Sequence, residues 1–125
     1  ANSSEIYGNL RAQGAIKCNE YTSVAPLNPY GISHATNLSI VDFYREQYSL
    51  SIKTGIFFNH ESPFRSPQFL SKKLAIGFAK LMKSNATAIQ LGNLDSIRDF
   101  GYAPKFMTAT YEIMKKEANS NFIFF

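Results

Sequence analysis

The segment from Gly55 to Arg65 joins an apolar run directly to polar and charged side chains, and reads Gly-Ile-Phe-Phe-Asn-His-Glu-Ser-Pro-Phe-Arg. Its apolar part is predicted to be a strand covered on both faces in a parallel sheet, because the side chains are continuously hydrophobic. Asn59 and His60 follow at the carboxyl end of this strand. Ligands of open α/β sheets bind at that end, so we expect the chemistry of the protein here.

The polar loop after this strand leads into a predicted helix over residues 67–83. Ser66 has a suitable N-cap side chain, and Pro67 suits the first turn because it has no N–H to leave unbonded. Apolar side chains recur at helical spacing, at Leu70, Leu74, Phe78 and Leu81. The expected site therefore lies in a strand-to-helix loop.

The remaining elements alternate between strands and helices. We expect a strand end at residues 3–7, helices at 29–49 and 104–117, and strands at 87–91 and 122–125. Asn28 is the expected N-cap of the first helix. The side chains expected to face the core are Ile32, Leu38, Val41, Tyr44 and Tyr48 in the first helix, and Phe106, Ala109, Ile113 and Met114 in the last. This alternation predicts an α/β fold with parallel strands and right-handed crossovers.

Length and composition indicate one globular unit with a small anionic ligand. The chain has 125 residues, of which 45% are hydrophobic and 18% charged, so intrinsic disorder is not expected. The net charge is +4, but the lysines and arginines are scattered and form no basic stripe. This pattern favours a small anion over nucleic acid as the partner.

Cysteine content and hydropathy predict a cytoplasmic protein. Cys18 is the only cysteine, so no internal disulfide can form and a reducing compartment is expected. No apolar stretch approaches the ~20 residues that cross a bilayer, and no signal peptide is recognised, so no membrane partner is expected. With two histidines and no carboxylate or cysteine at ligand spacing, no metal site is expected.

Four segments together resemble the extended short-chain dehydrogenase/reductase family. They are Ser-Ser-Glu-Ile-Tyr-Gly at 3–8, Asn-Pro-Tyr-Gly-Ile-Ser-His at 28–34, the 55–65 segment, and Leu-Gly-Asn-Leu-Asp-Ser-Ile-Arg-Asp-Phe-Gly at 91–101. The last two resemble the GDP-mannose 4,6-dehydratases in particular. The resemblance covers essentially the whole chain and corresponds to the middle of the family's enzyme.

The resemblance implies a partial Rossmann-type parallel sheet with flanking helices. No Gly-x-Gly-x-x-Gly turn is present, the chain starts without Met, and it stops inside an apolar run. We therefore expect residues 1–125 to be a single fragment that holds the catalytic and substrate-binding portion and lacks the N-terminal phosphate-binding half. The family also implies a homo-oligomer at full length.

The resemblance further implies a lyase with an internal redox cycle on GDP-mannose. Bound NADP takes hydride from C4 of the hexose, water leaves across C5 and C6, and the hydride returns to C6, which gives GDP-4-keto-6-deoxymannose. Tyr30 resembles the base at the C4 hydroxyl, Ser3 the hydroxyl residue that bonds the same oxygen, and Glu5 the carboxylate that handles the C5 proton. The implied cofactor contacts are Tyr30, His34, His60 and Arg65, and the implied substrate contacts are Asn59, Lys73 and Arg98.

His34 departs from the family pattern Tyr-x-x-x-Lys, since this chain has Tyr30-Gly-Ile-Ser-His34. A tyrosine base needs about 4 kcal/mol of phenolate stabilisation to act near neutral pH, and a permanently charged lysine helps to supply it. Imidazole is shorter and largely neutral there. We therefore expect reduced activity relative to a lysine form, with only a weak ribose hydrogen bond from His34.

Each assignment has a structural alternative. Tyr30 can be a helix-start aromatic packed on the core, His60 a loop histidine, and Ser3 the close of a strand. Glu61 and Ser62 are expected to brace the loop, and Asp95 and Asp99 to form an exposed turn with Arg98.

Two further function classes stay open at this point. One is a degenerate relative that binds a nucleotide sugar without turnover. The other is a sister dehydratase or epimerase for another nucleotide sugar, although Glu5 argues against a simple 4-epimerase, which needs no base at C5.

Overall fold

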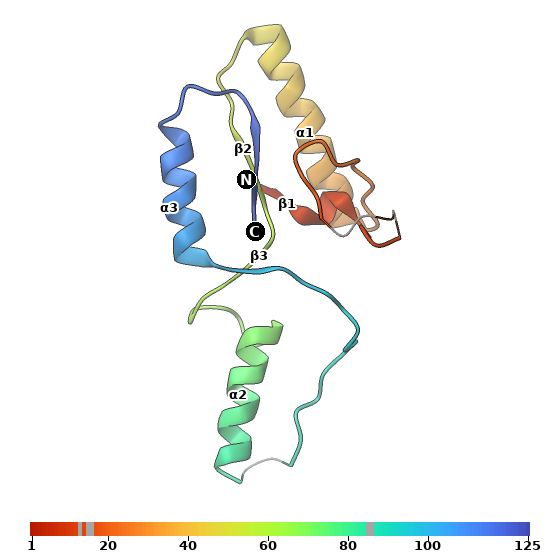
Figure 1. Ribbon diagram of the computed structural model, residues 1–125, viewed down its shortest axis with the longest axis vertical. Coiled ribbons are helices and arrows are strands. Elements are labelled where there is room, and N and C mark those ends of the chain that lie inside the picture. Colours follow the sequence, from red (N-terminus) through yellow and green to blue (C-terminus); the bar gives the residue numbers. More distant parts are fainter. Residues whose placement is uncertain (13, 15–16, 85–86) are drawn as a thin grey trace.

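The computed structural model describes residues 1–12, 14, 17–84 and 87–125. Strands and helices alternate along most of this length (Figure 1). In chain order the elements are β1 (Asn2–Ser3), the 3-10 helix η1 (Ser4–Tyr7), α1 (Pro29–Tyr48), β2 (Thr54–Phe57), β3 (Asn59–Glu61), α2 (Leu70–Met82), β4 (Phe100–Tyr102), α3 (Ala103–Met114) and β5 (Asn121–Phe124).

All strand pairs of the described residues are parallel, as the alternation predicts. A three-stranded sheet has the order β1-β2-β5, and a two-stranded sheet pairs β3 with β4. In the larger sheet Ile56 is in register with both Asn2 and Ile123. The fold class is therefore α/β with a parallel sheet, and the strands at 54–57 and 121–124 confirm the predicted ones.

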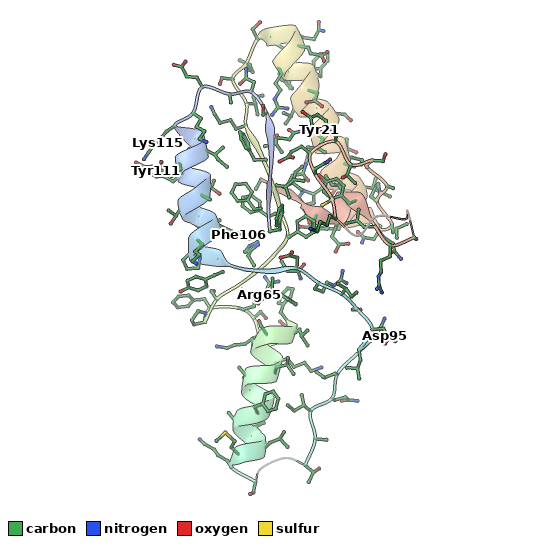
Figure 2. The ribbon with its side chains drawn as sticks, in the orientation of Figure 1. Tyr21, Arg65, Asp95, Phe106, Tyr111 and Lys115 are labelled. Atoms are coloured by element: carbon green, nitrogen blue, oxygen red, sulfur yellow. The ribbon has the colours of Figure 1, made fainter. Side chains whose placement is uncertain are left out.

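The helices α1 and α3 lie on opposite sides of the three-stranded sheet, while α2 extends beyond its end (Figure 1). Ile6, Tyr7 and Ile56 are fully buried between the sheet and α1, with Leu38 packed against them. On the α3 side, the rings of Phe57 and Phe124 stack with their centroids 4.5 Å apart. Phe106 joins this second cluster from α3 (Figure 2).

Both ends of α1 are held by specific contacts. Asn28 is the N-cap as predicted, and its Oδ1 accepts a hydrogen bond from the Gly31 N–H at 2.8 Å. Near the other end, the Arg45 guanidinium donates to the Ile52 and Ser120 carbonyls. These bonds connect α1 to the start of β2 and of β5.

Three predicted elements differ from the structure. Residues 4–7 form a 3-10 turn instead of a strand, because the turn buries the adjacent Ile6 and Tyr7 together, whereas a strand would point them to opposite faces. Ser66 is not a helix cap, since its hydroxyl bonds the Gln68 side chain and α2 begins only after Phe69. The predicted strand at 87–91 is absent from the described structure of that segment, where Ile89 packs against Gly77 of α2.

Several side chains predicted to face the core are exposed instead. The half-buried side chains of α1 include Leu38 and Val41, whereas Tyr48 is 61% exposed. On α3, Phe106 is buried as predicted, but Met114 is 67% exposed and the helix ends there, three residues early. The other exposed residues of these two predicted sets are Ile32, Tyr44 and Ala109. Helical spacing alone does not distinguish a face that packs on the sheet from one that stays open.

Candidate functional site

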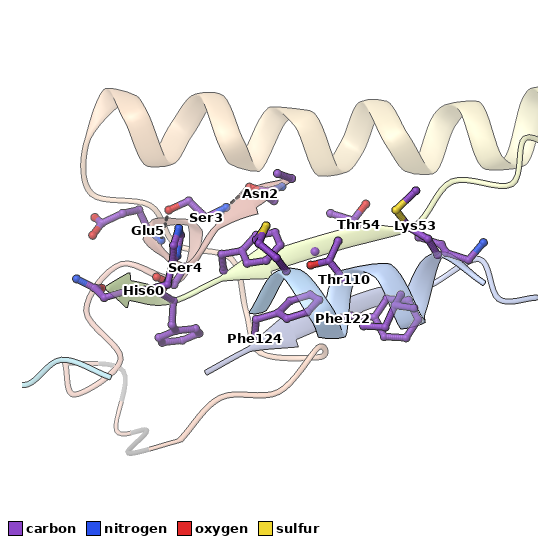
Figure 3. Close-up of a pocket in the computed structure, with 18 of the residues that line it drawn as sticks. Asn2, Ser3, Ser4, Glu5, Lys53, Thr54, His60, Thr110, Phe122 and Phe124 are labelled. Atoms are coloured by element: carbon purple, nitrogen blue, oxygen red, sulfur yellow. Dashed lines mark hydrogen bonds between the residues drawn. The ribbon is translucent and has the colours of Figure 1, made fainter. Parts of the chain in front are cut away.

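A pocket of about 1030 Å³ lies along the α3 side of the three-stranded sheet and reaches the carboxyl ends of β1 and β2. One part of its wall gathers most of the predicted site residues, namely Ser3, Glu5, Tyr30, Asn59, His60 and Arg65. They come from β1, η1, the start of α1, β3 and the loop that follows it. Figure 3 shows Ser3, Ser4, Glu5 and His60 grouped at one end of this pocket. These segments therefore line one pocket, while the catalytic and binding roles of the residues stay predictions.

Ser3 and Glu5 are placed by the tight turn that follows β1. The Ser3 hydroxyl accepts a hydrogen bond from the Glu5 N–H at 3.3 Å, which caps η1. The Glu5 carboxylate then points toward the start of α1, where Asn28 Nδ2 donates to Oε2 at 3.0 Å. A carboxylate and a hydroxyl are thus brought to the same turn of chain.

Tyr30 stands in the first turn of α1, directly after Pro29. It lines the pocket and is 57% exposed, so it is not a core aromatic. One helical turn later, the His34 ring meets the Tyr30 ring edge-on, with 4.4 Å between centroids. His34 itself does not line the pocket, and its carbonyl accepts a hydrogen bond from Asn2 Nδ2 at 2.9 Å.

His60 is oriented by its own backbone and by two aromatic rings. Its Nδ1 lies 3.0 Å from the Phe58 carbonyl oxygen. A carbonyl only accepts, so Nδ1 carries the proton, which leaves Nε2 of the neutral ring as an acceptor. The rings of Phe57 and Phe106 lie with centroids 5.9 Å and 5.6 Å from that of His60.

Arg65 is held by an acid and an aromatic ring between the sheet and α2 (Figure 2). Its Nε lies 3.3 Å from Glu61 Oε2, and its guanidinium carbon lies 3.4 Å from the ring centroid of Phe69. Glu61 also accepts a hydrogen bond from the Ser71 hydroxyl. The expectation that Glu61 braces the loop is confirmed, and the brace fixes the direction of a guanidinium at the pocket wall.

Two predicted substrate contacts lie outside this pocket. Lys73 is half-buried on α2, and Arg98 is on the exposed stretch between α2 and β4. Figure 2 places the neighbouring Asp95 on the outer side of that stretch. The segment that carries Asp95, Arg98 and Asp99 is exposed as predicted, and within the described residues no salt bridge joins Arg98 to either aspartate. The substrate roles of Lys73 and Arg98 stay predictions.

The pocket also contains residues that sequence patterns did not identify. Ser4 and Asn2 add polar groups beside Ser3, and Lys53 lies at the opposite end (Figure 3). The remainder of the wall is mostly apolar and includes Phe57, Phe122, Phe124, Met107 and Ile113, with Thr54 and Thr110 among them. A run of polar residues at the end of a strand was the available signal for Asn2 and Ser4. Lys53 precedes its strand, where no pattern points to a ligand.

Burial changes the acidity of two groups behind the site. It raises the pKa of Tyr7 to about 12, and the nearby charges of Cys18 and Glu20 add to this effect. Burial also raises the pKa of Cys18, with smaller contributions from Glu20 and Asp99. Both groups therefore stay protonated at neutral pH, which does not favour Cys18 as a nucleophile.

Residues 1–12, 14, 17–84 and 87–125 contain neither a grouped set of metal ligands nor a membrane-spanning helix. No three histidine, cysteine or acidic side chains there are grouped to hold a metal ion. No helix in this part of the chain is long and apolar enough to cross a bilayer.

The polar part of the pocket can support proton transfer beside an anionic ligand. A phenol, a hydroxyl and a carboxylate are the groups that move or hold protons in such sites. The imidazole of His60 and the guanidinium of Arg65 add an acceptor and a fixed positive charge.

Sequence comparison finds the same family across the whole chain. The family model described as GDP-mannose 4,6 dehydratase matches residues 1–125. The chain is 34% identical over 98% of its length to "GDP-mannose 4,6 dehydratase 2" of Caenorhabditis elegans and to GDP-mannose 4,6 dehydratase of Homo sapiens. It covers 31% and 32% of these two proteins, so it spans about a third of their length.

Solved structures with low sequence identity share the fold. RMD from Pseudomonas aeruginosa, complexed with NADPH, superimposes with a TM-score of 0.87 at 22% identity, over 98% of this chain and 43% of that one. The dTDP-glucose 4,6-dehydratase of Bacillus anthracis, in complex with NAD, gives a TM-score of 0.82 at 20% identity, over 98% and 38%. The parallel-sheet α/β fold is therefore of the Rossmann type found in these two proteins.

Proposed function

Because this chain belongs to the GDP-mannose 4,6-dehydratase family, we propose that the complete protein converts GDP-mannose to GDP-4-keto-6-deoxymannose with NADP as cofactor. The observation that carries the proposal is the convergence of Ser3, Glu5 and Tyr30 on one pocket, which Asn59 and His60 of β3 also line. Residues 1–125 would supply the catalytic and substrate-binding portion of this lyase.

The pocket suits a nicotinamide ring beside a hexose in size and chemistry. Its volume of about 1030 Å³ is at the upper end of ordinary ligand pockets, which reach roughly 1,000 Å³. His60 would hold the cofactor through its Nε2 acceptor. Arg65 would hold it through the guanidinium that Glu61 fixes in place. When bound, NADP supplies the hydride chemistry of the reaction. The neighbours of known structure carry NADPH or NAD, which supports a nicotinamide cofactor more strongly than it supports NADP in particular.

Three side chains would move or hold protons. Tyr30 accepts the proton of the C4 hydroxyl, and the Ser3 hydroxyl donates a hydrogen bond to the same oxygen. Once C4 is a ketone, the proton on C5 is acidic, and the Glu5 carboxylate removes it. The C6–O bond then breaks, and the departing hydroxyl takes the proton that Glu5 has accepted from C5 and leaves as water. Asn59, Lys73 and Arg98 would hold the nucleotide sugar.

Glu5 supports a dehydratase over a 4-epimerase, because epimerisation at C4 needs no base at C5. A second candidate function is binding without turnover. It is supported by His34, which stands where the family pattern has lysine and which lies outside the pocket. In that case the ligand would still bind, but Tyr30 would be a weak base.

Oligomerisation and location are further parts of the proposal. The exposed apolar side chains Ile40, Phe43, Tyr44 and Tyr48 along α1 support a homo-oligomer in which this helix is covered. The single cysteine supports a reducing, cytoplasmic location.

Incubation of the complete protein with GDP-mannose and NADP tests the proposal. NMR of the sugar signals should show the C6 methyl group of a 6-deoxy product, and Glu5→Gln should reduce this signal to a small residual amount. Stabilisation of the protein by GDP-mannose without product would favour the binding-only candidate. Product from a dTDP- or UDP-sugar, with none from GDP-mannose, would reject the substrate assignment.

A further inference from the structure

The side-chain amide of Asn28 makes two hydrogen bonds, one to α1 and one to η1. Its Oδ1 accepts from the Gly31 N–H at 2.8 Å, which caps α1. Its Nδ2 donates to Glu5 Oε2 at 3.0 Å, across 23 residues of sequence. The amide therefore connects the start of the helix that carries Tyr30 to the carboxylate on η1.

The orientation of this amide follows from its two partners. A backbone N–H can only donate, so the atom that faces Gly31 is the carbonyl oxygen. A carboxylate accepts, so the nitrogen faces Glu5. Aspartate at this position would cap the helix but repel the carboxylate, because it has no donor.

The Glu5 backbone is held tightly, but its carboxylate has a single support. The Glu5 carbonyl oxygen packs against Gly31 so closely that a Cβ there would lie 2.6 Å from it. Within the described residues, Asn28 is the one side chain that hydrogen-bonds the carboxylate. That bond uses Oε2 and leaves Oε1 without a hydrogen-bond partner in the same described part of the chain, on a residue that lines the pocket.

We propose that Asn28 is a positioning residue, which anchors Glu5 Oε2 so that Oε1 faces the reacting sugar. The inference rests on the proposed function, in which Oε1 takes the proton from C5. The C5–H electron pair then forms the C5=C6 bond as the C6–O bond breaks. Asn28 does not line the pocket and so acts through Glu5. Anchoring one oxygen limits the rotation of the carboxylate and keeps the other in reach of the substrate.

Asn28→Asp is the sharpest test, because aspartate is an equally good N-cap and keeps the helix start, while it replaces the donor to Glu5 with a second carboxylate that repels it. We expect kcat for GDP-mannose to fall at least about tenfold, the loss typical of one hydrogen bond to a charged group. KM should stay within about twofold, because the substituted side chain is outside the pocket. Asn28→Ser, which also caps the helix, serves as a second variant if Asn28→Asp does not fold.

A double-mutant cycle with Glu5→Gln separates positioning from a general structural effect. In the Glu5→Gln background the Asn28→Asp change should cause no further loss of residual activity, since its target carboxylate is gone. An unchanged kcat in Asn28→Asp, or an equal loss in both backgrounds, would overturn the proposal. A rise in KM without a fall in kcat would do the same.

The cycle also distinguishes this inference from the proposed function. If the unmodified protein makes no product from GDP-mannose, the proposed function fails first. The energetic coupling between Asn28 and Glu5 is then measured from thermal unfolding midpoints. Asn28→Asp should lower the unfolding midpoint, and adding Glu5→Gln should restore it, because the glutamine amide donates to the new carboxylate. Independent effects of the two changes would contradict the inference.

Discussion

The imidazole of His34 packs edge-on against the phenol ring of Tyr30, with 4.4 Å between the ring centroids and 64° between their planes. His34 Nδ1 is buried and has no hydrogen-bond partner within the described residues. The side chain therefore contacts the tyrosine ring instead of the pocket, which it does not line. Imidazole also carries no permanent positive charge, unlike the lysine that the family pattern has at this position.

His34→Lys should raise kcat/KM of the complete protein for GDP-mannose by about tenfold, because a permanent charge one helical turn from Tyr30 stabilises its phenolate. Initial rates with saturating NADP measure this. His34→Gln is the matched control, since it is polar and uncharged, and it should leave the rate unchanged or lower. Equal turnover in the original protein and in His34→Lys would contradict the role assigned to this position.

Gly31→Ala should destabilise the protein although alanine is the better helix former. The gain in helix propensity is about 1 kcal/mol, whereas the new Cβ would lie 2.6 Å from the Glu5 carbonyl oxygen, which is backbone and cannot turn aside. Overpacking of this kind costs about 1–3 kcal/mol, so we expect a net loss. Urea unfolding measures it. Gly92→Ala is the control, because nothing lies within 4 Å of its Cβ, and a similar loss there would reject the steric explanation.

Arg45→Lys should lower the free energy of unfolding by about 1–3 kcal/mol, because lysine cannot reproduce the planar set of donors. Arg45 donates to the Ile52 carbonyl at 2.8 and 2.9 Å, to the Ser120 carbonyl at 3.1 Å and to Asn121 Oδ1 at 3.1 Å. Urea titration measures the loss in free energy of unfolding for Arg45→Lys and for the control Lys115→Gln, which breaks an exposed ion pair with Glu112. The exposed pair should contribute less than about 1 kcal/mol. Equal losses would show that the Arg45 bonds add little.

Tyr7 should make the stability depend on alkaline pH. Its pKa is raised to about 12 in the folded state by burial, from 10.0 for an ordinary tyrosine. The folded state thus keeps a proton that the unfolded chain releases, so this contribution is complete below about pH 10 and is lost as the pH rises through about 12. The thermal unfolding midpoint should be measured from about pH 8 to about pH 12. Over this range it should fall more steeply for the original protein than for Tyr7→Phe. Parallel curves for the two proteins would contradict the shift.

Local signals in the sequence predicted the elements that depend on neighbouring residues. Asn28 followed by Pro29 predicted the start of α1, and the apolar run through Phe57 predicted β2. The prediction of Ser66 as a helix cap was wrong, because its hydroxyl hydrogen-bonds the Gln68 side chain and the helix starts later. The pairing of β3 with β4 left no such signal, since each is three residues long and they lie about 40 positions apart.

The candidate site was predictable as a set of segments but not as a geometry. The sequence placed the chemistry at the carboxyl end of β2, and the pocket there is also lined by residues of β1, η1 and the first turn of α1. The brace of Arg65 by Glu61 and Phe69 was expected only in part, because an ion pair and a ring stack depend on how the loop after β3 closes. The placement of Lys73 and Arg98 away from the pocket depends on where α2 lies relative to the sheet.

The amino-acid order by itself determined the alternation of strands and helices and the family motifs. It also determined the polar residues at the carboxyl ends of β1 and β2. These features depend on residue type and on contacts within a few positions. The tertiary structure decided which of these side chains share a pocket. It brought Asn28 to Glu5, 23 positions away, since contacts between segments far apart in the chain form only when the buried Ile6, Tyr7 and Ile56 pack the sheet against α1. The contact between His34 and Tyr30 is instead local, because the two residues are one turn apart on α1.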